Sequence, residues 1–531
     1  MPSMLSVRPA VRRCACAGAL TLALLGAGLP ASAADGDGPG LHRFYSQRVT
    51  WASCGADRPR DLQCGKVTVP LDYARPGSGT LELALARYRA SGPSRGSVVL
   101  NFGGPGGAGV PALAAGGREF MDLTNGYDVV AFDPRGVGQS SPVSCGTGSA
   151  LYEVLSADDA AAGDPQAALE RWRRAAAECA AHAGAVLRHI GTVDSARDLD
   201  VIRQALGDKK LNYLGFSYGT RLGAVYAAEF PDKVGRMALD GVDTLTEPLA
   251  EQGRVAAEGQ QAAFDAFLHW CVRDLACPFG DDRRTARARV LRLVRSLDRD
   301  PVPMVFGGEL SGQALVGAIS QALYSKRLWP LLEHAVASLV EDGDTRRIEA
   351  FTSGGVTLPG RRGPAPKAHG VLVDPEDVPP DNLAAAMMAI NCADDPDRPG
   401  ADRIGRDLAR LRTEYEQASP VFGRFRLNGL LMCYGRPKGT DFVRERVKNL
   451  EVPKMLLVGT RGDPATPYRW TVETAKRLGS STVVLDNRGQ GHTGYGSSKC
   501  VHRKVDDFLL YGSLPPSGSS CPADPEPDAG D

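Results

Sequence analysis

Short apolar runs separated by turn residues form the first clear pattern along the chain. Residues 66–71 and 81–89 have the composition of β-strands, with turn residues between them. Residues 97–102 and 127–132 are apolar for most of their length. A strand needs that composition when both of its faces are buried. The pattern therefore predicts a sheet in which at least these two strands are covered on both sides.

Further along, stretches with helical periodicity alternate with strand-like runs. The helical stretches are residues 165–185, 195–206, 218–230 and 501–511, and the strand-like runs are residues 211–216, 236–240, 454–459 and 482–486. Strands that alternate with helices indicate a parallel sheet with helices on both faces. We therefore predict an α/β protein with a mostly parallel, doubly wound sheet.

Between residues 246 and 440 the strand signal disappears, and helical segments rich in Arg and Ala, such as 253–272 and 282–297, replace it. A chain of 531 residues also exceeds the size of one ordinary core. We therefore predict a mainly helical cap insertion that interrupts the sheet-containing core. The expected boundaries are residues 45–245 for the first part of the core, 246–440 for the cap, and 441–513 for the second part.

The first 33 residues have the three parts of a secretory signal peptide. Basic Arg8, Arg12 and Arg13 precede an apolar stretch at residues 14–29, and small residues follow up to Ala33. We predict that residues 1–33 are removed during export and that the mature protein is secreted.

Three further segments shape the expected chain. Residues 352–380 are rich in Gly, Pro and charge, which is typical of a long surface loop. Residues 514–531 consist mainly of Pro, Ser, Gly and Asp, so we expect a flexible tail except near Cys521. After the signal there is no run of about 18 apolar residues, so the sequence predicts no membrane span.

The balance of acidic and basic residues indicates what kind of molecule the protein binds. Lys and Arg together number 62, as do Asp and Glu, and no long block of like charge is present. This balance disfavours a nucleic-acid-binding surface and a polybasic membrane-binding surface. We expect peptides or other small molecules as substrates, and a monomer.

Cysteine usage fits an exported protein. Of the 12 cysteines, Cys14 and Cys16 lie in the signal, which leaves an even number in an oxidising compartment. Metal ligation is the weaker interpretation, and connectivity does not follow from sequence alone. As a hypothesis, the order along the chain suggests local pairs: Cys54 with Cys64, Cys145 with Cys179, Cys271 with Cys277, Cys392 with Cys433, and Cys500 with Cys521.

A candidate nucleophile lies between a predicted strand and a predicted helix. Gly215-Phe216-Ser217-Tyr218-Gly219 matches the G-x-S-x-G pattern, in which a serine occupies a tight strand-to-helix turn. In such a turn the backbone is strained and the hydroxyl is exposed, and the glycines supply the space. The turn also puts Ser217 at a helix N-terminus. The amide of Tyr218 is therefore one expected donor to the oxyanion of acyl transfer.

A second oxyanion donor is expected from the glycine-rich loop that follows the predicted strand at residues 97–100. The loop comprises residues 101–107, and Gly104 is the proposed amide donor. The alternative is a loop that only turns the chain. A phosphate-binding loop is disfavoured because the Lys and Ser/Thr of that motif are missing.

The general base and the acid that would act with Ser217 are expected in loops that follow the last predicted strands. His492 lies in a glycine-rich loop after the run at 482–486, whereas His502 falls in the next helix. Asp463 follows the preceding strand and comes before His492, as the acid of this chemistry does. Asp240, Asp243 and Asp486 are the alternatives for the acid. The order Ser217, Asp463, His492 is the one used by α/β-hydrolases.

Five motifs together resemble the prolyl and tripeptidyl aminopeptidase branch of the α/β-hydrolases. They are Gly-Gly-Pro-Gly at residues 103–106, Asp-Pro-Arg-Gly-Val-Gly-Gln-Ser at 133–140, Gly-Phe-Ser-Tyr-Gly at 215–219, Asp-Pro-Ala-Thr-Pro at 463–467, and Gly-His at 491–492. The likeness runs from about residue 49 to residue 511. We expect Asp133 and Arg135 to form a buried charge network without a catalytic role.

More narrowly, the segment Ala-Ile-Asn-Cys-Ala-Asp at residues 389–394 looks like that of secreted bacterial tripeptidyl-aminopeptidase-type proteins with a TAP-like C-terminal segment. The resemblance implies release of short peptides, tripeptides among them, from free N-termini. Phe102 departs from the prolyl aminopeptidases, which usually have His there. This departure favours the tripeptidyl type and argues against a strict preference for N-terminal proline.

An exopeptidase must hold the α-ammonium of its substrate, and carboxylates of the insertion are the natural candidates. Asp394 and Asp395 are proposed for this role. The alternatives are that both belong to a solvated acidic turn beside a disulfide, or that a Glu of a cap helix holds the ammonium.

The sequence therefore predicts a secreted serine exopeptidase that works through an acyl-enzyme and needs no metal or organic cofactor. An esterase or lipase with the same triad is the nearest alternative, because the fold does not choose the substrate. A non-catalytic binding protein on a hydrolase fold is the alternative from another class, although the presence of all three triad residues disfavours it.

Overall fold

The structure is a computed structural model that describes residues 40–146, 150–156, 164–305, 307–352, 372–398 and 400–525. The predicted signal peptide, residues 1–33, lies outside these residues, as does most of the predicted loop at 352–380.

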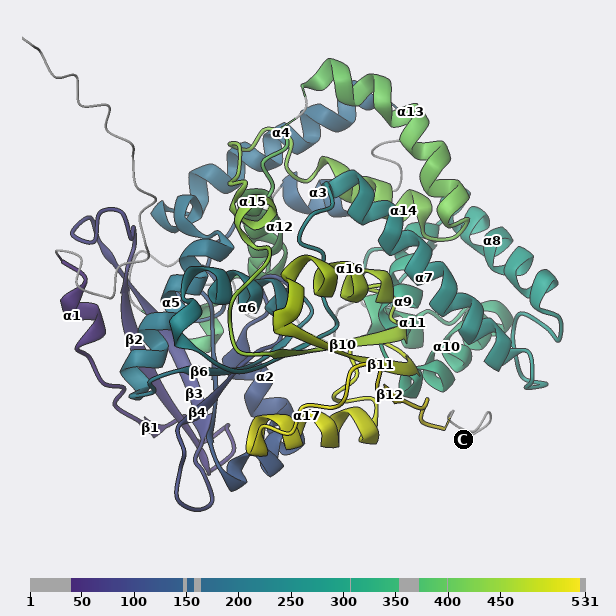
Figure 1. Cartoon of the computed structure of the whole chain (residues 1–531). Coiled ribbons are helices and arrows are strands. Elements are labelled where there is room, and N and C mark those ends of the chain that lie inside the picture. Colours follow the sequence, from purple (N-terminus) through teal and green to yellow (C-terminus); the bar gives the residue numbers. More distant parts are fainter. Residues whose placement is uncertain are drawn as a thin grey trace, which may run out of the picture. The chain divides into compact units, whose positions relative to one another are not determined.

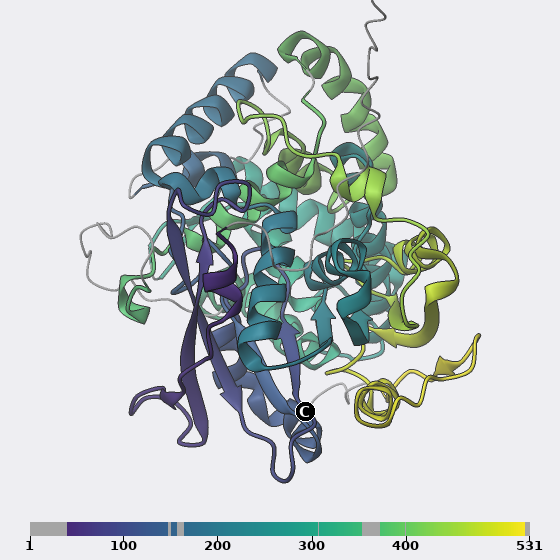
Figure 2. The same ribbon diagram turned by 60° about the vertical axis from the view of Figure 1, so that its left-hand side comes forward.

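Ten strands form one sheet within the described residues (Figure 2). In spatial order they are β1 (Ala52–Ser53), β2 (Leu62–Pro70), β3 (Thr80–Tyr88), β5 (Asp128–Phe132), β4 (Ser97–Asn101), β6 (Leu211–Phe216), β7 (Val234–Asp240), β10 (Met455–Gly462), β11 (Thr482–Gln490) and β12 (Ser520–Cys521). Pairing is antiparallel from β1 to β5 and parallel from β5 to β12. In Figure 2 the purple β2–β3 hairpin and the yellow C-terminal segment lie on opposite sides of the view.

The central strands bury alternate side chains on opposite faces of the sheet. Val99, Val130 and Tyr213 pack on one face with α5 (Thr192–Leu206) and α6 (Tyr218–Glu229). Their neighbours in the chain point the other way, toward α2 (Gly109–Gly116) and α17 (Lys499–Tyr511). Figure 1 shows the same arrangement at β10 and β11, with α17 on one side and α16 (Tyr468–Leu478) on the other. The prediction of a mostly parallel, doubly wound sheet is confirmed.

The segment between β7 and β10 is mainly helical in the described residues. Its helices are α7 (Leu249–Cys271), α8 (Arg283–Arg299), α9 (Gly312–Ala322), α10 (Trp329–Asp342), α11 (Arg346–Thr352), α12 (Asn382–Asp394), α13 (Ala401–Ala418), α14 (Gly423–Asn428) and α15 (Phe442–Arg446). A two-residue hairpin, β8 (Val302–Pro303) with β9 (Glu309–Leu310), interrupts them. The boundaries of the cap at residues 246 and 440 stay a prediction.

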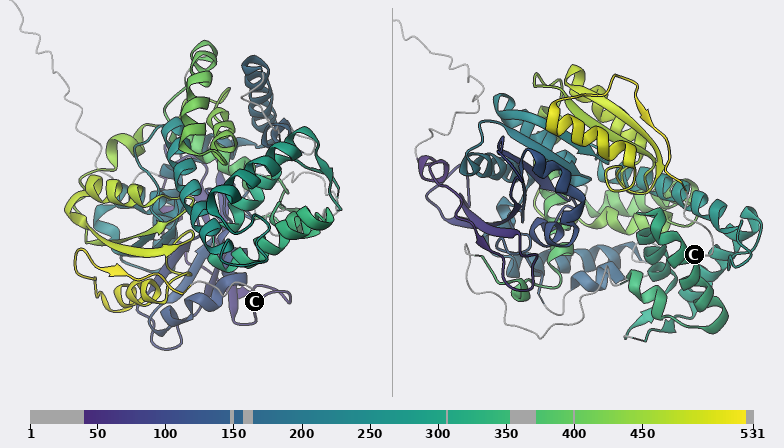
Figure 3. Two further views of the ribbon diagram at one scale, coloured as in Figure 1. Left: turned by 90° about the vertical axis from the view of Figure 1, so that its right-hand side faces the viewer. Right: turned by 90° about the horizontal axis from the view of Figure 1, so that it is seen from below.

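Two different cores stabilise this segment. Helices α7 to α11, called here the α7–α11 lobe, share a core with many aromatic rings, including Phe264, Phe267, Trp270 and Trp329. In Figure 3 these teal and green helices form a group next to the strands. In contrast, the buried residues of α12 belong to the same core as one face of the sheet. That core also receives α3 (Ala150–Ser156) and α4 (Pro165–His182).

The described residues contain five disulfides, and they confirm the hypothesis of local pairs. The bonds are Cys54–Cys64, Cys145–Cys179, Cys271–Cys277, Cys392–Cys433 and Cys500–Cys521. The last bond explains β12, a short strand that sequence patterns did not predict, because it fixes Cys521 beside α17. None of the helices in the described part of the chain has the length and apolar character to cross a membrane.

Candidate active site

Ser217 occupies the turn between β6 and α6 in a strained conformation. Its φ is 55°, a value that non-glycine residues rarely adopt. A Cβ on Gly215 would lie 2.5 Å from the carbonyl oxygen of Gly219, and a Cβ on Gly219 would lie 2.7 Å from Asn101 Oδ1. Both flanking glycines are therefore required by close backbone approach, as the motif predicts. Tyr218 opens α6, so its amide has no partner within the helix.

The glycine-rich loop lies directly beside this turn. A Cβ on Gly103 would lie 2.9 Å from the Cβ of Ser217 and 3.4 Å from the amide nitrogen of Tyr218. Within the loop, the Gly103 amide donates to Asn101 Oδ1, and the Gly107 amide donates to the Gly103 carbonyl. The amide of Gly104 takes part in no hydrogen bond within the described residues.

Asp463 and His492 form a hydrogen-bonded pair. His492 Nδ1 lies 2.9 Å and 3.0 Å from the two carboxylate oxygens of Asp463. The carboxylate is 2% exposed and also accepts hydrogen bonds from the amides of Ala465, Thr466 and Thr493. The Thr466 hydroxyl donates to it as well, at 3.0 Å. Asp463 is thus held rigidly, and its position fixes the orientation of the imidazole.

Asp240 connects the nucleophile to the histidine loop. Its carbonyl accepts a hydrogen bond from the Ser217 amide at 2.9 Å, and its buried carboxylate accepts from the amides of Gly494 and Tyr495. Burial raises the pKa of Asp240 to about 6. A Cβ on the next residue, Gly241, would lie 3.4 Å from His492 Cε1. Ser217 and His492 are therefore brought to the same edge of the sheet, at the end of β7.

The other candidate acids have different partners. Asp240 binds backbone amides, Asp243 forms an ion pair with Arg221 at 2.7 Å, and Asp486 forms one with Arg461 at 2.9 Å. Among the predicted candidates for the acid, only Asp463 is hydrogen-bonded to His492 within the described residues.

The charge of His492 is controlled by surrounding carboxylates. Burial is the largest single influence on its pKa and lowers it, but Asp463, with smaller contributions from Asp240 and Asp243, outweighs burial. The pKa of His492 is therefore raised above its ordinary value of 6.5. An imidazole in this position is readily protonated, which suits a group that accepts a proton from a hydroxyl.

With this geometry in view, comparisons with known proteins decide the family. A family model described as an alpha/beta hydrolase fold matches residues 96–329, and one described as TAP-like protein matches residues 419–521. The serine protease Hip1 of Mycobacterium tuberculosis is 34% identical over 506 residues, which cover 90% of this chain and 91% of that protein. This chain belongs to the TAP-like α/β-hydrolases.

Two further relatives show the range of this family. A tripeptidyl aminopeptidase of Streptomyces coelicolor is 31% identical over 489 residues, covering 89% of this chain and 86% of the relative. A carboxylesterase B of Mycobacterium tuberculosis is 31% identical over 504 residues, covering 92% of both chains. The resemblance that the motifs indicated is confirmed, and the TAP-like hydrolase described here is a serine hydrolase.

In this hydrolase, α12 supports α6, the helix that begins directly after Ser217, through buried hydrogen bonds. Asp394, at the end of α12, accepts from the amide of Thr192 at 2.9 Å and from its hydroxyl at 2.5 Å. The Thr192 hydroxyl also contacts the Tyr218 hydroxyl at 2.7 Å, and Arg221 of α6 lies 3.4 Å from Asp394. The sequence did not single out Thr192, because its partners are distant in the chain.

Asp395 differs from its neighbour. One carboxylate oxygen accepts from Arg444 at 2.9 Å and from the Asp397 amide at 3.0 Å. The other, Oδ2, is buried and has no hydrogen-bond partner in the described residues. Asp394 and Asp395 both line a small cavity, together with Arg221 and Arg444.

Helix α12 also contacts the glycine-rich loop at residues 101–107 and the turn at residues 133–140. The side chain of Asn382 accepts from the Gly138 amide and donates to the carbonyls of Gly136 and Val143. A Cβ on Gly106 would lie 3.0 Å from the carbonyl of Leu383. The first turn of α12 therefore fixes the loop that contains Gly104.

The expected charge network between Asp133 and Arg135 is replaced by two separate arrangements. Both side chains are fully buried, as expected. Arg135, however, pairs with Asp198 at 2.6 Å, whereas Asp133 accepts from the amides of Val110 and Gln139. The difference arises because α5 supplies a carboxylate to Arg135, and sequence distance concealed that contact.

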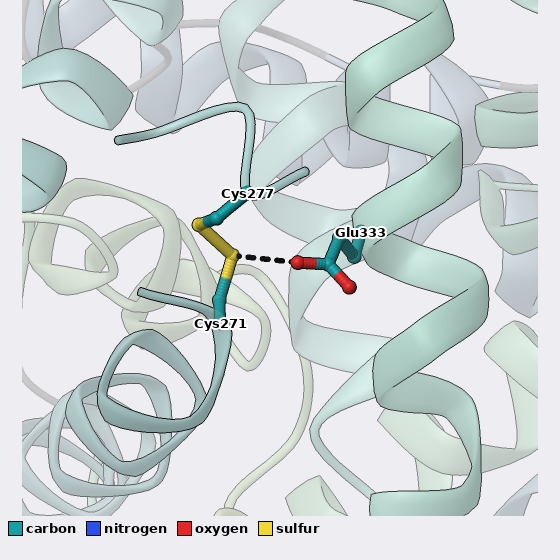
Figure 4. A group of neighbouring side chains, drawn as sticks. All are labelled: Cys271, Cys277 and Glu333. Carbon is teal, nitrogen blue, oxygen red and sulfur yellow. Dashed lines mark hydrogen bonds between the residues drawn. A yellow bond between two sulfur atoms is a disulfide. The ribbon is translucent and has the colours of Figure 1, made fainter. Parts of the chain in front are cut away.

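Two groups in the described residues have metal-ligand side chains close together, and neither lies among the residues of the triad. One consists of Cys271, Cys277 and Glu333 (Figure 4), but its sulfurs are joined in a disulfide and are not thiolate ligands. Glu333 Oε1 lies 3.2 Å from the Cys271 sulfur. Burial raises the pKa of Glu333 to about 7, so its carboxyl group can supply the proton for this contact. The other group is Asp122, His502 and Asp506.

Proposed function

We propose that this hydrolase is a secreted serine exopeptidase that releases short peptides, in particular tripeptides, from free N-termini. The observation that carries the proposal is the hydrogen-bonded pair of His492 and Asp463 at the sheet edge where Ser217 occupies a strained turn. The signal-like residues 1–33 and the five disulfides support export.

The proposed chemistry follows from these positions. His492 takes the proton of Ser217, and the serine oxygen attacks the scissile carbonyl. The amides of Gly104 and Tyr218 stabilise the negative oxygen of the tetrahedral intermediate. His492 then gives its proton to the departing amine, and the carboxylate of Asp463 stabilises the imidazolium in between. Attack by water on the acyl-enzyme returns Ser217 to its starting state.

Recognition of a free N-terminus requires an acceptor for the α-ammonium, and Asp394 and Asp395 stay the proposed residues. Asp395 has the stronger support, because its buried Oδ2 has no partner in the described residues and because the residue lines a cavity. The carboxylate of Asp394 already binds Thr192 and Arg221. We therefore propose that Asp395 contacts the ammonium and that Asp394 positions the site.

Ester hydrolysis is the second candidate function. It is favoured by the relative described as carboxylesterase B, which is as similar in identity to this chain as the tripeptidyl aminopeptidase. The same triad attacks esters and amides alike, so the substrate must be decided by measurement.

Three matched substrates test the proposal: a tripeptide p-nitroanilide with a free N-terminus, its N-acetylated form, and a short p-nitrophenyl ester. We expect the highest kcat/KM for the free peptide and little cleavage of the acetylated form. Ser217→Ala should lower kcat at least ~10³-fold with unchanged folding, and the exposed Ser78→Ala is the matched control. Equal cleavage of the free and acetylated peptides, or preference for the ester, would refute exopeptidase activity.

A further inference from the structure

The α7–α11 lobe rests directly on the acid–base pair. The Tyr324 carbonyl accepts a hydrogen bond from the His492 amide at 2.8 Å, and the two rings meet edge to face with centroids 5.0 Å apart. On α7, a Cβ on Gly259 would lie 3.2 Å from the Asp463 carbonyl. Two contacts therefore join this lobe to the two residues of the acid–base pair.

Arg426 binds the residue next to Gly259, and this cationic side chain has no carboxylate partner in the described residues. Arg426 of α14 donates through Nε to Gln260, the residue after Gly259, at 2.8 Å. No carboxylate of the described residues forms an ion pair with Arg426, and its two terminal nitrogens have no hydrogen-bond partner there. By contrast, Arg424 on the same helix has Asp298 at 3.5 Å.

The surroundings of Arg426 make an anionic ligand favourable. Burial lowers the pKa of Arg426, and the electrostatic contributions that oppose this come from Tyr324 and Tyr415 rather than from a carboxylate. The Arg426 side chain is half-buried. A half-buried guanidinium without a counter-ion is unfavourable, and a carboxylate that binds its two terminal nitrogens side by side removes much of that cost.

The position of Arg426 indicates which part of a substrate it meets. His492 delivers its proton to the departing amine, so the departing half of the substrate lies on the His492 side of the scissile bond. Tyr324, whose ring contacts His492, is also an electrostatic neighbour of Arg426.

We propose that Arg426, supported by Gln260, binds a carboxylate on the departing residue, so that peptides whose free C-terminus follows the scissile bond are preferred. This inference rests on the proposed exopeptidase activity and assigns a substrate class to it. For release of tripeptides, the preferred substrates are tetrapeptides with a free α-carboxylate.

The test compares a tetraalanine peptide with its C-terminal carboxamide, both with a free N-terminus, by chromatographic measurement of kcat/KM for tripeptide release. We expect the wild-type protein to prefer the free acid roughly 10-fold or more, which is the size of one charge-assisted hydrogen-bonded pair. Arg426→Gln should abolish the preference by slowing cleavage of the acid alone. Arg426→Lys should retain part of it, and Arg424→Gln should retain all of it.

The outcomes separate this inference from the function on which it rests. Equal cleavage of acid and amide by the wild-type protein overturns the role of Arg426 and leaves the exopeptidase in place. A preference that survives in Arg426→Gln overturns it as well. Cleavage of neither peptide, with rapid ester hydrolysis, overturns the exopeptidase itself. If Arg426→Gln does not fold, the wild-type preference and its reduction in Arg426→Lys decide the question.

Discussion

In the α7–α11 lobe, aromatic side chains pack against one another in a separate core, whereas α12 is buried in the same core as the sheet. The two regions belong to the same insertion but contact different parts of the active site. The lobe meets His492 and Asp463 through Tyr324 and Gly259. Helix α12 contacts the glycine-rich loop at residues 101–107 and, through Thr192, helix α6.

The two regions of the insertion should therefore respond differently to substitution. A region with its own core can change or move without disturbing the sheet, whereas a helix that shares the core of the sheet cannot. We therefore expect substitutions in α12 to change stability and turnover together. Substitutions in the lobe interior should change stability while turnover of the folded protein persists.

The acid–base pair gives the largest expected effect and the reference for the other variants. Asp463→Asn removes the carboxylate that orients His492 and stabilises its charge, so kcat should fall about 10³- to 10⁴-fold with the fold intact.

In the wild-type protein the base must be neutral, so kcat/KM should rise with pH, with a midpoint above 6.5 because Asp463 raises the pKa of His492. The midpoint should move to lower pH in Asp463→Asn. A pH–rate profile checks both, and an unchanged midpoint contradicts the role of Asp463.

Asp394→Ala tests the coupling of α12 to the nucleophile helix. The substitution removes the carboxylate that accepts from the Thr192 amide and hydroxyl, and it removes one of the two carboxylates that pair with Arg221, which keeps Asp243. We expect a loss of roughly 3 kcal/mol in the free energy of unfolding, together with a lower kcat. Urea denaturation and steady-state kinetics measure the two effects.

The matched control for this variant is Leu332→Ala, a fully buried residue in the core of the lobe. This substitution should lower the free energy of unfolding by roughly 2–4 kcal/mol, while kcat at low temperature stays near the wild-type value. If both variants lower kcat equally, the two regions do not differ as described. A higher KM for free N-termini alone in Asp394→Ala would instead indicate direct ammonium binding.

Glu333→Gln gives the smallest expected effect and is confined to the lobe. Because the pKa of Glu333 is raised from 4.5 to about 7, its carboxyl group favours the folded state fully below pH 4.5, and that contribution is lost as the pH rises through 7. Gln stays neutral, so the variant should be more stable than the wild-type protein at pH 8, by roughly 1–3 kcal/mol, and similar at pH 4. Thermal unfolding at both values checks this. Equal differences at pH 4 and pH 8 would show that Glu333 does not titrate as described.

Local sequence patterns were sufficient to predict the central strands of the sheet and the turn that contains Ser217. The strands β4, β5 and β6 are short apolar runs between turns, and the structure has them within one residue of the predicted bounds. Such strands must be apolar on both faces, so their composition reveals them without knowledge of their partners. The turn at Ser217 was equally visible, because its glycines are required by contacts within a few residues.

Contacts between distant segments escaped the same reasoning. Tyr324 lies 168 positions before His492 in the chain, and nothing in its local sequence indicates that it contacts the imidazole. Thr192 and Asp240 act through buried hydrogen bonds whose partners come from other elements. Asp240 was visible only as an alternative for the acid, and Thr466 only as part of the Asp-Pro-Ala-Thr-Pro motif that contains Asp463.

The C-terminal strand has a consequence beyond catalysis. Without β12, the outer side of β11 would present unpaired backbone groups to any other extended chain, which is a common origin of aggregation. Ser520 and Cys521 occupy part of that side, and the bond from Cys521 to Cys500 keeps them there. The disulfide therefore protects part of an exposed sheet edge by a covalent bond, so that this edge does not depend on the packing of a short strand alone.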